Sequence, residues 1–229
     1  RMEISWFFSI LPYLEQKAVY EEMKRAPNPY HSTLAKQVAS VLVCPSDGKN
    51  ETDYTQPAGE YRTTNYVAVM GPALDDRRVG TESYPYGYAA TDGIIYYYSK
   101  TRIADVTDGT TNTMIAGERI SDIRLWTKGW MFGSGGSEEL AVYQGKTIMW
   151  PMNTDPEVLC YRFGTKPGGC PTASQQLYFN YIDFGSRHPG GAQFVQGDGS
   201  VQFLNETINF TTYENLAMIA DGEVVAWSP

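Results

Sequence analysis

Two short β-type runs near the C-terminus, residues 192–196 and 200–204, constrain the fold most, because only three residues separate them. Asp-Gly between alternating apolar residues is a strong hairpin signal, since both central residues of a type I′ turn need positive φ. With Asp198-Gly199 as a two-residue loop, Phe194 lies opposite Phe203, and one face carries the apolar side chains. A three-residue loop would split that face, so the sequence favours the tighter turn.

His188 and Asp198 invite a catalytic interpretation, because a carboxylate can orient an imidazole base. Nine residues separate them, and an extended run of that length holds its ends roughly 20–30 Å apart. We therefore predict a structural role, in which His188 fixes the approaching loop by hydrogen bonds and Asp198-Gly199 makes the turn. A metal or an acidic partner beside His188, in a cleft that solvent reaches, would instead point to a catalyst.

The spacing of His188, nine residues and then Asp198-Gly199 resembles the H-x9-D-G signature of a large family of bacterial pilin-like proteins. Those proteins carry a prepilin-type N-terminal cleavage and methylation helix and a C-terminal domain of unknown function. Further stretches resemble the family in the same order, from near residue 5 to near residue 226: Leu11–Gln16, Cys44–Asp47, Thr64–Val67, Ile103–Thr113 and Gly117–Arg119.

The resemblance implies one soluble head domain over residues 1–229, without the apolar N-terminal helix that would anchor it in the cell envelope or outside the cell. The implied role is that of a non-enzymatic pilin-like or pseudopilin-like subunit, associated with the surface or with type II-like secretion. Its partners would be other pilin-like subunits, contacted through the missing helix. The first alternative is an extracellular module that binds a polysaccharide, a solute or a protein.

A hydrolase is the least favoured alternative. Asp75-Asp76 and Glu138-Glu139 are adjacent in sequence and point apart, whereas glycoside cleavage needs two carboxyl groups that face each other. A net charge of −8 and a pI near 4.8 argue against a nucleic-acid partner and against an anionic membrane surface, since both need a basic face.

The pattern of elements predicts an α+β fold, with an N-terminal helix packed on an antiparallel sheet and irregular insertions. Apolar residues at a spacing of three and four over residues 6–18 predict an amphipathic helix, with Ser5 as N-cap and a break at Pro12. Strands are expected over 65–70 and 113–120. A second helix is expected from Ser32 to about Val41, and a further one over 213–220 with Thr212 as its N-cap.

Three cysteines leave one without a partner. Cys160 and Cys170 flank a loop with glycine and proline, so a small disulfide ring and two free thiols both fit the spacing. The export that the resemblance implies favours the disulfide. The resemblance also leaves Cys44 open to pairing with a cysteine upstream of Arg1. A structural zinc site is not expected, because the chain contains no Cys-x-x-Cys pair and has only two histidines.

Tyrosines gather in two stretches. Tyr84, Tyr86 and Tyr88 lie in a loop and are candidates for ligand binding, because exposed aromatic rings stack on sugars and form protein interfaces. Packing against the core is the alternative there. Packing is favoured for residues 94–98, whose alternation suits a strand.

Asp105, Asp108 and Asn112 are oxygen ligands close in sequence and form a candidate calcium site. Their spacing misses the calcium loop D-x-[DN]-x-[DN]-G, because Gly109 falls one place too early. Closure of turns by bonds to nearby amides is the favoured alternative. The resemblance keeps calcium open, since some secretion pseudopilins hold it in a comparable loop, and no other cofactor is expected.

Overall fold

The structure is a computed structural model that describes residues 3–25, 40–47, 52–53, 61–62, 64–74, 77–80, 86–120, 132–135, 141–142, 144–154 and 178–223. Its helical elements are short, with η marking 3-10 turns: α1 (Trp6–Ile10), η1 (Leu11–Leu14), α2 (Lys17–Arg25), η4 (Ser40–Leu42), η5 (Pro45–Asp47), η6 (Ile103–Asp105), η9 (Phe179–Tyr181) and α3 (Phe210–Asn215). None of the helices in these ranges has the length and the apolar character needed to cross a bilayer.

Five strands form the central sheet, in the order β10 (Gly145–Ile148), β4 (Tyr66–Pro72), β7 (Met114–Glu118), β11 (Gly191–Gln196) and β12 (Val201–Asn205). The other strands form smaller sheets: β1 (Glu3–Ile4), β8 (Phe132–Gly135) and β9 (Ala141–Val142) in one, β2 (Thr52–Asp53) and β3 (Tyr61–Arg62) in another, and β5 (Arg78–Val79) and β6 (Ala89–Ala90) in a third. The α+β class is confirmed, although the central sheet is mixed, because β10 runs parallel to β4. A long connection joins these two strands, so no hairpin dictates their direction.

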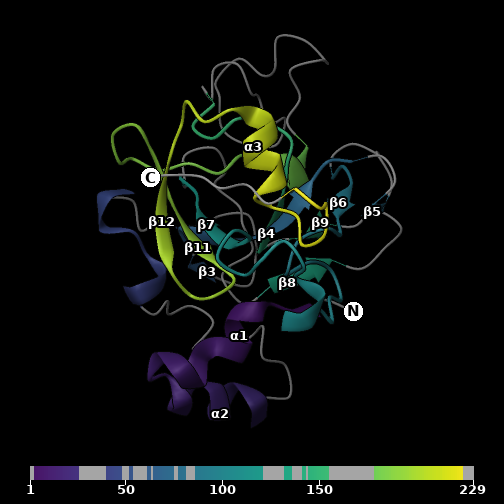
Figure 1. The fold of residues 1–229 in the computed structure, drawn as a ribbon. Helices are drawn as coiled ribbons and strands as arrows, with labels where there is room; N and C mark the ends of the chain where they lie inside the picture. Colours follow the sequence, from purple (N-terminus) through teal and green to yellow (C-terminus); the bar gives the residue numbers. More distant parts are fainter. Residues whose placement is uncertain are drawn as a thin grey trace.

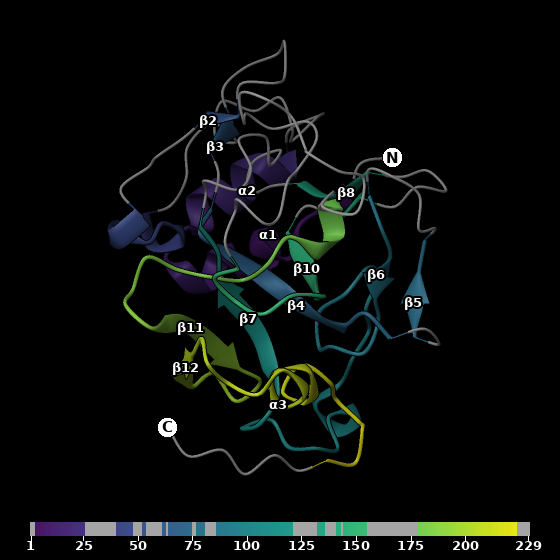
Figure 2. The same ribbon diagram turned by 90° about the horizontal axis from the view of Figure 1, so that it is seen from above.

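The central sheet lies between the N-terminal helices and α3 (Figure 1). Alternation along β4 explains the two layers, because successive side chains of a strand point to opposite faces. Tyr66 packs against a cluster with Phe7 and Leu11 from the helices, whereas Val67 packs in a cluster with Tyr213 from α3. Figure 2 shows α3 beside the sheet from the perpendicular direction.

The predicted break in the N-terminal helix is confirmed. α1 passes into η1 at Leu11, with Pro12 in the first turn of η1, and Glu15 ends that turn with a φ of 59°. Proline removes one backbone donor and disfavours helical geometry at the residue before it. Ser5 holds the N-cap position, but its side chain makes no capping hydrogen bond.

The predicted hairpin forms, but its predicted register is wrong. Val195 pairs with Val201, and Phe194 pairs with Gln202 rather than with Phe203. The Gly199 amide donates to the Gln196 carbonyl at 2.9 Å, and Gly199 has a φ of +86°. A three-residue loop that ends in a left-handed glycine is the second common hairpin turn. The prediction failed because it assumed one apolar face, whereas this hairpin carries apolar side chains on both.

Two other local predictions are also corrected. α3 begins three residues earlier than expected, because Asn209 is its N-cap and accepts a hydrogen bond from the Thr212 amide. Residues 94–98 form a bend and a turn rather than a strand, and Tyr98 has a φ of 57°, which no strand allows. Tyr96 and Tyr97 do pack against the core, as predicted.

Candidate functional site

Three reactive side chains from distant parts of the chain meet on the face of the sheet that the N-terminal helices cover. Cys44 lies between η4 and η5, Glu118 is the last residue of β7, and His188 lies in the loop before β11. Cys44 and Glu118 are buried, with 6% and 2% of their surface exposed. The side chain of His188 is 33% exposed, so solvent reaches the group from the histidine side.

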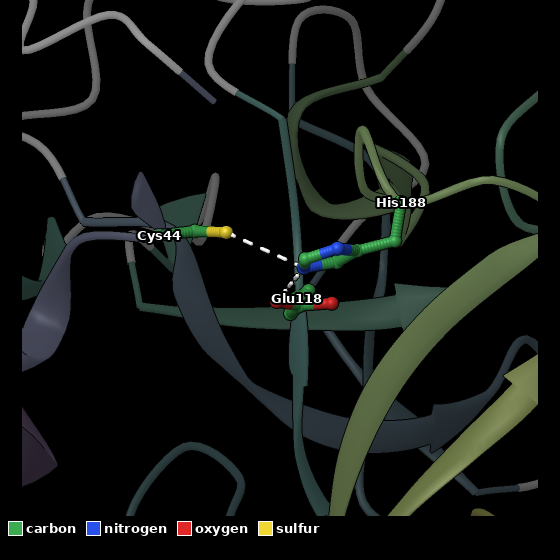
Figure 3. A group of neighbouring side chains, drawn as sticks. All are labelled: Cys44, Glu118 and His188. Atoms are coloured by element: carbon green, nitrogen blue, oxygen red, sulfur yellow. Dashed lines mark hydrogen bonds and ion pairs between the residues drawn. The ribbon is translucent and has the colours of Figure 1, made fainter. Parts of the chain in front are cut away.

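Both neighbours of His188 face the same ring nitrogen. The Cys44 Sγ lies 3.6 Å from His188 Nε2, and Glu118 Oε1 lies 3.4 Å from the same atom. Figure 3 shows the two dashed lines meeting at this nitrogen. One atom from each of the three residues can be chosen so that all three lie within 4.8 Å of one another. The three groups therefore converge on one point.

Hydrogen bonds to the backbone hold the cluster in place. Glu118 Oε2 accepts from the Gln193 amide at 2.7 Å, which leaves Oε1 directed at His188. The Cys44 amide donates to Asn65 Oδ1 at 2.9 Å. The His188 amide donates to the Ser186 hydroxyl at 3.0 Å, a backbone bond that holds the loop and leaves the imidazole directed at Cys44 and Glu118.

A charged network borders the cysteine side of the cluster. Asp47 accepts from Asn65 at 2.6 Å and pairs with Arg187 at 3.3 Å. Burial lowers the pKa of the fully buried Arg119 to about 10, and the charge of Asp47 opposes that shift. On the other side, burial raises the pKa of Tyr66, as do the nearby Glu118 and Cys44.

Glu118 is the acidic partner that would direct attention toward a catalyst. In a catalytic triad, however, the nucleophile and the carboxylate address different ring nitrogens, so that the acid orients the base toward the nucleophile. Here the thiol and the carboxylate share Nε2 of His188, which leaves no relay through the ring. Convergence of sulfur, nitrogen and oxygen on one point is instead the arrangement of a metal site.

The structure keeps His188 and Asp198 apart, and no hydrogen bond or ion pair joins these two described residues. Asp198 accepts from the Ser200 amide at 2.8 Å and from its hydroxyl at 2.7 Å. Hydrogen bonds from Ser200 lower the pKa of Asp198, and the bond from its hydroxyl contributes most. These contacts close the turn, which is the role predicted for Asp198-Gly199.

The three candidate calcium ligands each have a partner of another kind. Asp105 pairs with Arg102 at 2.8 Å, and Asp108 accepts from the Asp221 amide at 2.7 Å and from the Gly222 amide at 3.2 Å. The Asn112 side chain donates to the Asp108 carbonyl. The Asn112 bond is local, whereas Asp108 accepts from amides 113 and 114 residues away in the chain, and calcium binding stays a prediction.

Two of the three loop tyrosines pack rather than project. Tyr86 and Tyr88 lie against the cluster that contains Tyr181, and the Arg78 guanidinium stacks over the Tyr88 ring at 3.7 Å from its centre. Tyr84 lies outside the described residues, as do Cys160 and Cys170 with their predicted disulfide.

Two hollows border the N-terminal helices. One is an apolar groove of about 460 Å³ between α1–η1 and the sheet, lined by residues that include Trp6, Ile10, Glu118, Val195 and Val201. The other is a cavity of about 240 Å³ whose lining includes Trp6 and Tyr96–Tyr98. The groove therefore reaches Glu118 of the cluster, whereas the cavity is lined in part by aromatic side chains and is called the aromatic cavity below.

Sequence reasoning missed both Cys44 and Glu118 as partners of His188. Cys44 was left over from a count of cysteines, and Glu118 stood within a stretch that carried only the family resemblance. The one signal that could have joined them is that all three lie in family-like motifs, Cys44–Asp47, Gly117–Arg119 and the H-x9-D-G signature.

A family model matches the chain, whereas no curated protein and no solved structure matches it. The matching family model covers residues 1–211, which is most of the 229 residues. The chain therefore belongs to the family described as protein of unknown function (DUF1559).

Proposed function

We propose that this chain is the head of a non-enzymatic pilin-like subunit, displayed at the cell envelope or outside the cell by an apolar helix that precedes it in the full protein. The observation that carries the proposal is the use of the D-G pair of the H-x9-D-G signature in folding. Asp198 closes the hairpin turn through Ser200, and Gly199 supplies its left-handed residue. A signature that builds a scaffold suits a protein that works by being displayed.

The face that would meet such a helix is apolar and partly open. Val201 is 61% exposed and Phe203 is 38% exposed, and Val201 also lines the groove beside α1. Apolar side chains exposed together mark contact surfaces. We assign this groove face to the preceding helix of the same full-length chain, with other pilin-like subunits contacted through that helix.

Processing and display of the full-length protein test the proposal. We expect prepilin peptidase to cleave it before the apolar helix, and antibodies to label the head on intact cells. Mass spectrometry of the N-terminus reads out the cleavage, and a variant with a blocked cleavage site is the matched control. An unprocessed protein that stays inside the cell, or a head released without its helix, would contradict the proposal.

The aromatic cavity favours glycan or solute binding as a second function. Tyr96–Tyr98 and Trp6 line it, and Tyr98 is 64% exposed. Aromatic faces of this kind stack on sugar rings. This binding and display by a pilin-like subunit are compatible.

Tyr98→Ala is expected to weaken binding of the best oligosaccharide on a glycan array by about tenfold, because it removes one stacking face. Tyr13→Ala is the matched control, since Tyr13 is 85% exposed on η1 and lies outside the cavity lining. Titration calorimetry measures both variants. Equal affinities of Tyr98→Ala and the unmodified protein, or no binding on the array, would remove this second function.

A further inference from the structure

We infer that Cys44, Glu118 and His188 bind one Zn²⁺ ion, with water in the fourth position. This inference does not rest on the proposed function, and hydrolysis by the zinc-bound protein would contradict the non-enzymatic role, since an open position with water is typical of catalytic zinc. The three donors are a thiol, a carboxylate and an imidazole, which are the zinc ligands that proteins use most. Two anionic ligands would neutralise the ion, so the complex suits a site in which Cys44 and Glu118 are buried.

The two distances from His188 Nε2 match edges of a zinc tetrahedron, and Cys44 Sγ lies within 4.8 Å of a Glu118 oxygen. Zinc binds sulfur at about 2.3 Å, imidazole nitrogen at about 2.0–2.1 Å and carboxylate oxygen at about 2.0–2.2 Å. At the tetrahedral angle these lengths place sulfur about 3.5–3.6 Å from nitrogen, and nitrogen about 3.4 Å from oxygen. The observed separations from His188 Nε2 are 3.6 Å to Cys44 Sγ and 3.4 Å to Glu118 Oε1.

Direct hydrogen bonding suits the 3.6 Å contact between Cys44 Sγ and His188 Nε2, but it explains the Glu118 distance less well. A charge-assisted bond between imidazolium and carboxylate is about 2.7–2.9 Å long, and the Glu118 contact at 3.4 Å is much longer. One Nε2 proton also cannot serve Cys44 and Glu118 together at good angles. A cation at the point of convergence satisfies all three atoms at once.

One bond to a ligating group has the form of a second coordination shell, and two more hold the backbone of the ligands. Partners that orient the ligands are typical of metal sites and tune their affinity. The Gln193 amide holds one oxygen of Glu118 and leaves the other for the ion. Asn65 accepts from the Cys44 amide, and Ser186 accepts from the His188 amide.

Metal binding to the reduced 229-residue chain tests the inference. We expect one Zn²⁺ per chain in competition with a chromophoric chelator, and Co²⁺ should give a thiolate charge-transfer band with the intense visible bands of a tetrahedral ion. Cys44→Ser, Glu118→Gln and His188→Gln should each weaken Zn²⁺ binding by more than about 100-fold. Circular dichroism checks that each variant remains folded.

The chain offers matched controls for these variants. His31→Gln changes the other histidine, and Cys160→Ser combined with Cys170→Ser changes the other two cysteines. Both controls should keep the affinity and the Co²⁺ band. Loss of binding in the controls but not in the three variants would overturn the site.

A measurement on the unmodified protein covers variants that fail to fold. Zn²⁺ should slow alkylation of Cys44, because a bound thiolate is shielded, and mass spectrometry locates the label. Alkylation of Cys44 at an unchanged rate would overturn the inference. So would a disulfide at Cys44 in the full-length protein isolated from cells, since a cysteine in a disulfide cannot supply a thiolate.

Discussion

Gly191→Ala is expected to lower the free energy of unfolding by about 3 kcal/mol, which is a large effect for a single methyl group. A β-carbon at Gly191 would overlap the backbone carbonyl oxygen of Leu204 and lie 2.9 Å from its carbonyl carbon. Leu204 belongs to the partner strand of the hairpin. The strand cannot move away without breaking the ladder, so the strain stays in the sheet.

The same substitution should disturb the loop that carries His188. The Gly191 carbonyl accepts from the Ser186 hydroxyl at 2.7 Å, and that hydroxyl also accepts from the His188 amide. Displacement of β11 therefore pulls on both bonds. We expect Gly191→Ala to lower the stability of the fold and the affinity for Zn²⁺ together.

Gly190→Ala is the matched control. Gly190 has a φ of +83°, but its β-carbon would meet no atom within 4 Å, so we expect a cost of only about 1 kcal/mol from the left-handed backbone. Urea unfolding followed by circular dichroism measures both variants. The explanation fails if Gly191→Ala costs no more than Gly190→Ala.

Raising the pH from about 4 to about 7 is expected to destabilise the protein through Asp183. Burial raises the pKa of Asp183 to about 7. Its Oδ2 accepts from the Thr154 amide at 3.1 Å, whereas its Oδ1 has no hydrogen-bond partner among the described residues. The buried Tyr213 hydroxyl also has no hydrogen-bond partner among the described residues. Burial is the main cause that raises the pKa of Tyr213, and the charge of Asp183 is the second.

The sign follows from proton binding in the two states. Between the unfolded pKa of 3.8 and the folded pKa of about 7, the folded protein holds a proton that the unfolded chain has lost. The stabilising effect of this proton is complete below the lower value and disappears as the pH rises through the higher one. The gap of about 3 between the unfolded and the folded pKa corresponds to about 4 kcal/mol in the free energy of unfolding.

Asp183→Asn should remove this dependence, because an amide does not titrate. We expect the stability difference between the variant and the unmodified protein to shift in favour of the variant by about 4 kcal/mol from pH 4 to pH 8. Glu214→Gln is the control, since Glu214 is less buried than Asp183 and its pKa is raised by burial alone. Parallel pH profiles for Asp183→Asn and the unmodified protein would contradict the prediction.

Local chemistry was sufficient to predict several elements. Proline dictates its own φ and removes an amide donor, so the break at Pro12 follows from the sequence. Apolar patterning located β4 and β7. The residues around 197–199 had to form a turn, because Asp and Gly tolerate the necessary dihedral angles.

The register of the hairpin depended on contacts with other elements. Either loop length satisfies the turn chemistry of Asp198-Gly199, and the choice depends on which side chains each face buries. Phe194 is buried with Phe184 and Tyr213, whereas Phe203 remains partly exposed on the other face. A pattern that assumes one apolar face cannot make that choice.

By itself the sequence determined the α+β class, the break at Pro12, the structural use of Asp198-Gly199 and, by resemblance, the order of the family motifs. Only the tertiary structure decided that Cys44 and Glu118 meet at one nitrogen of His188. The reason is physical. Local propensities act over a few residues, whereas 144 positions separate Cys44 from His188, and only the packing of the sheet brings them together.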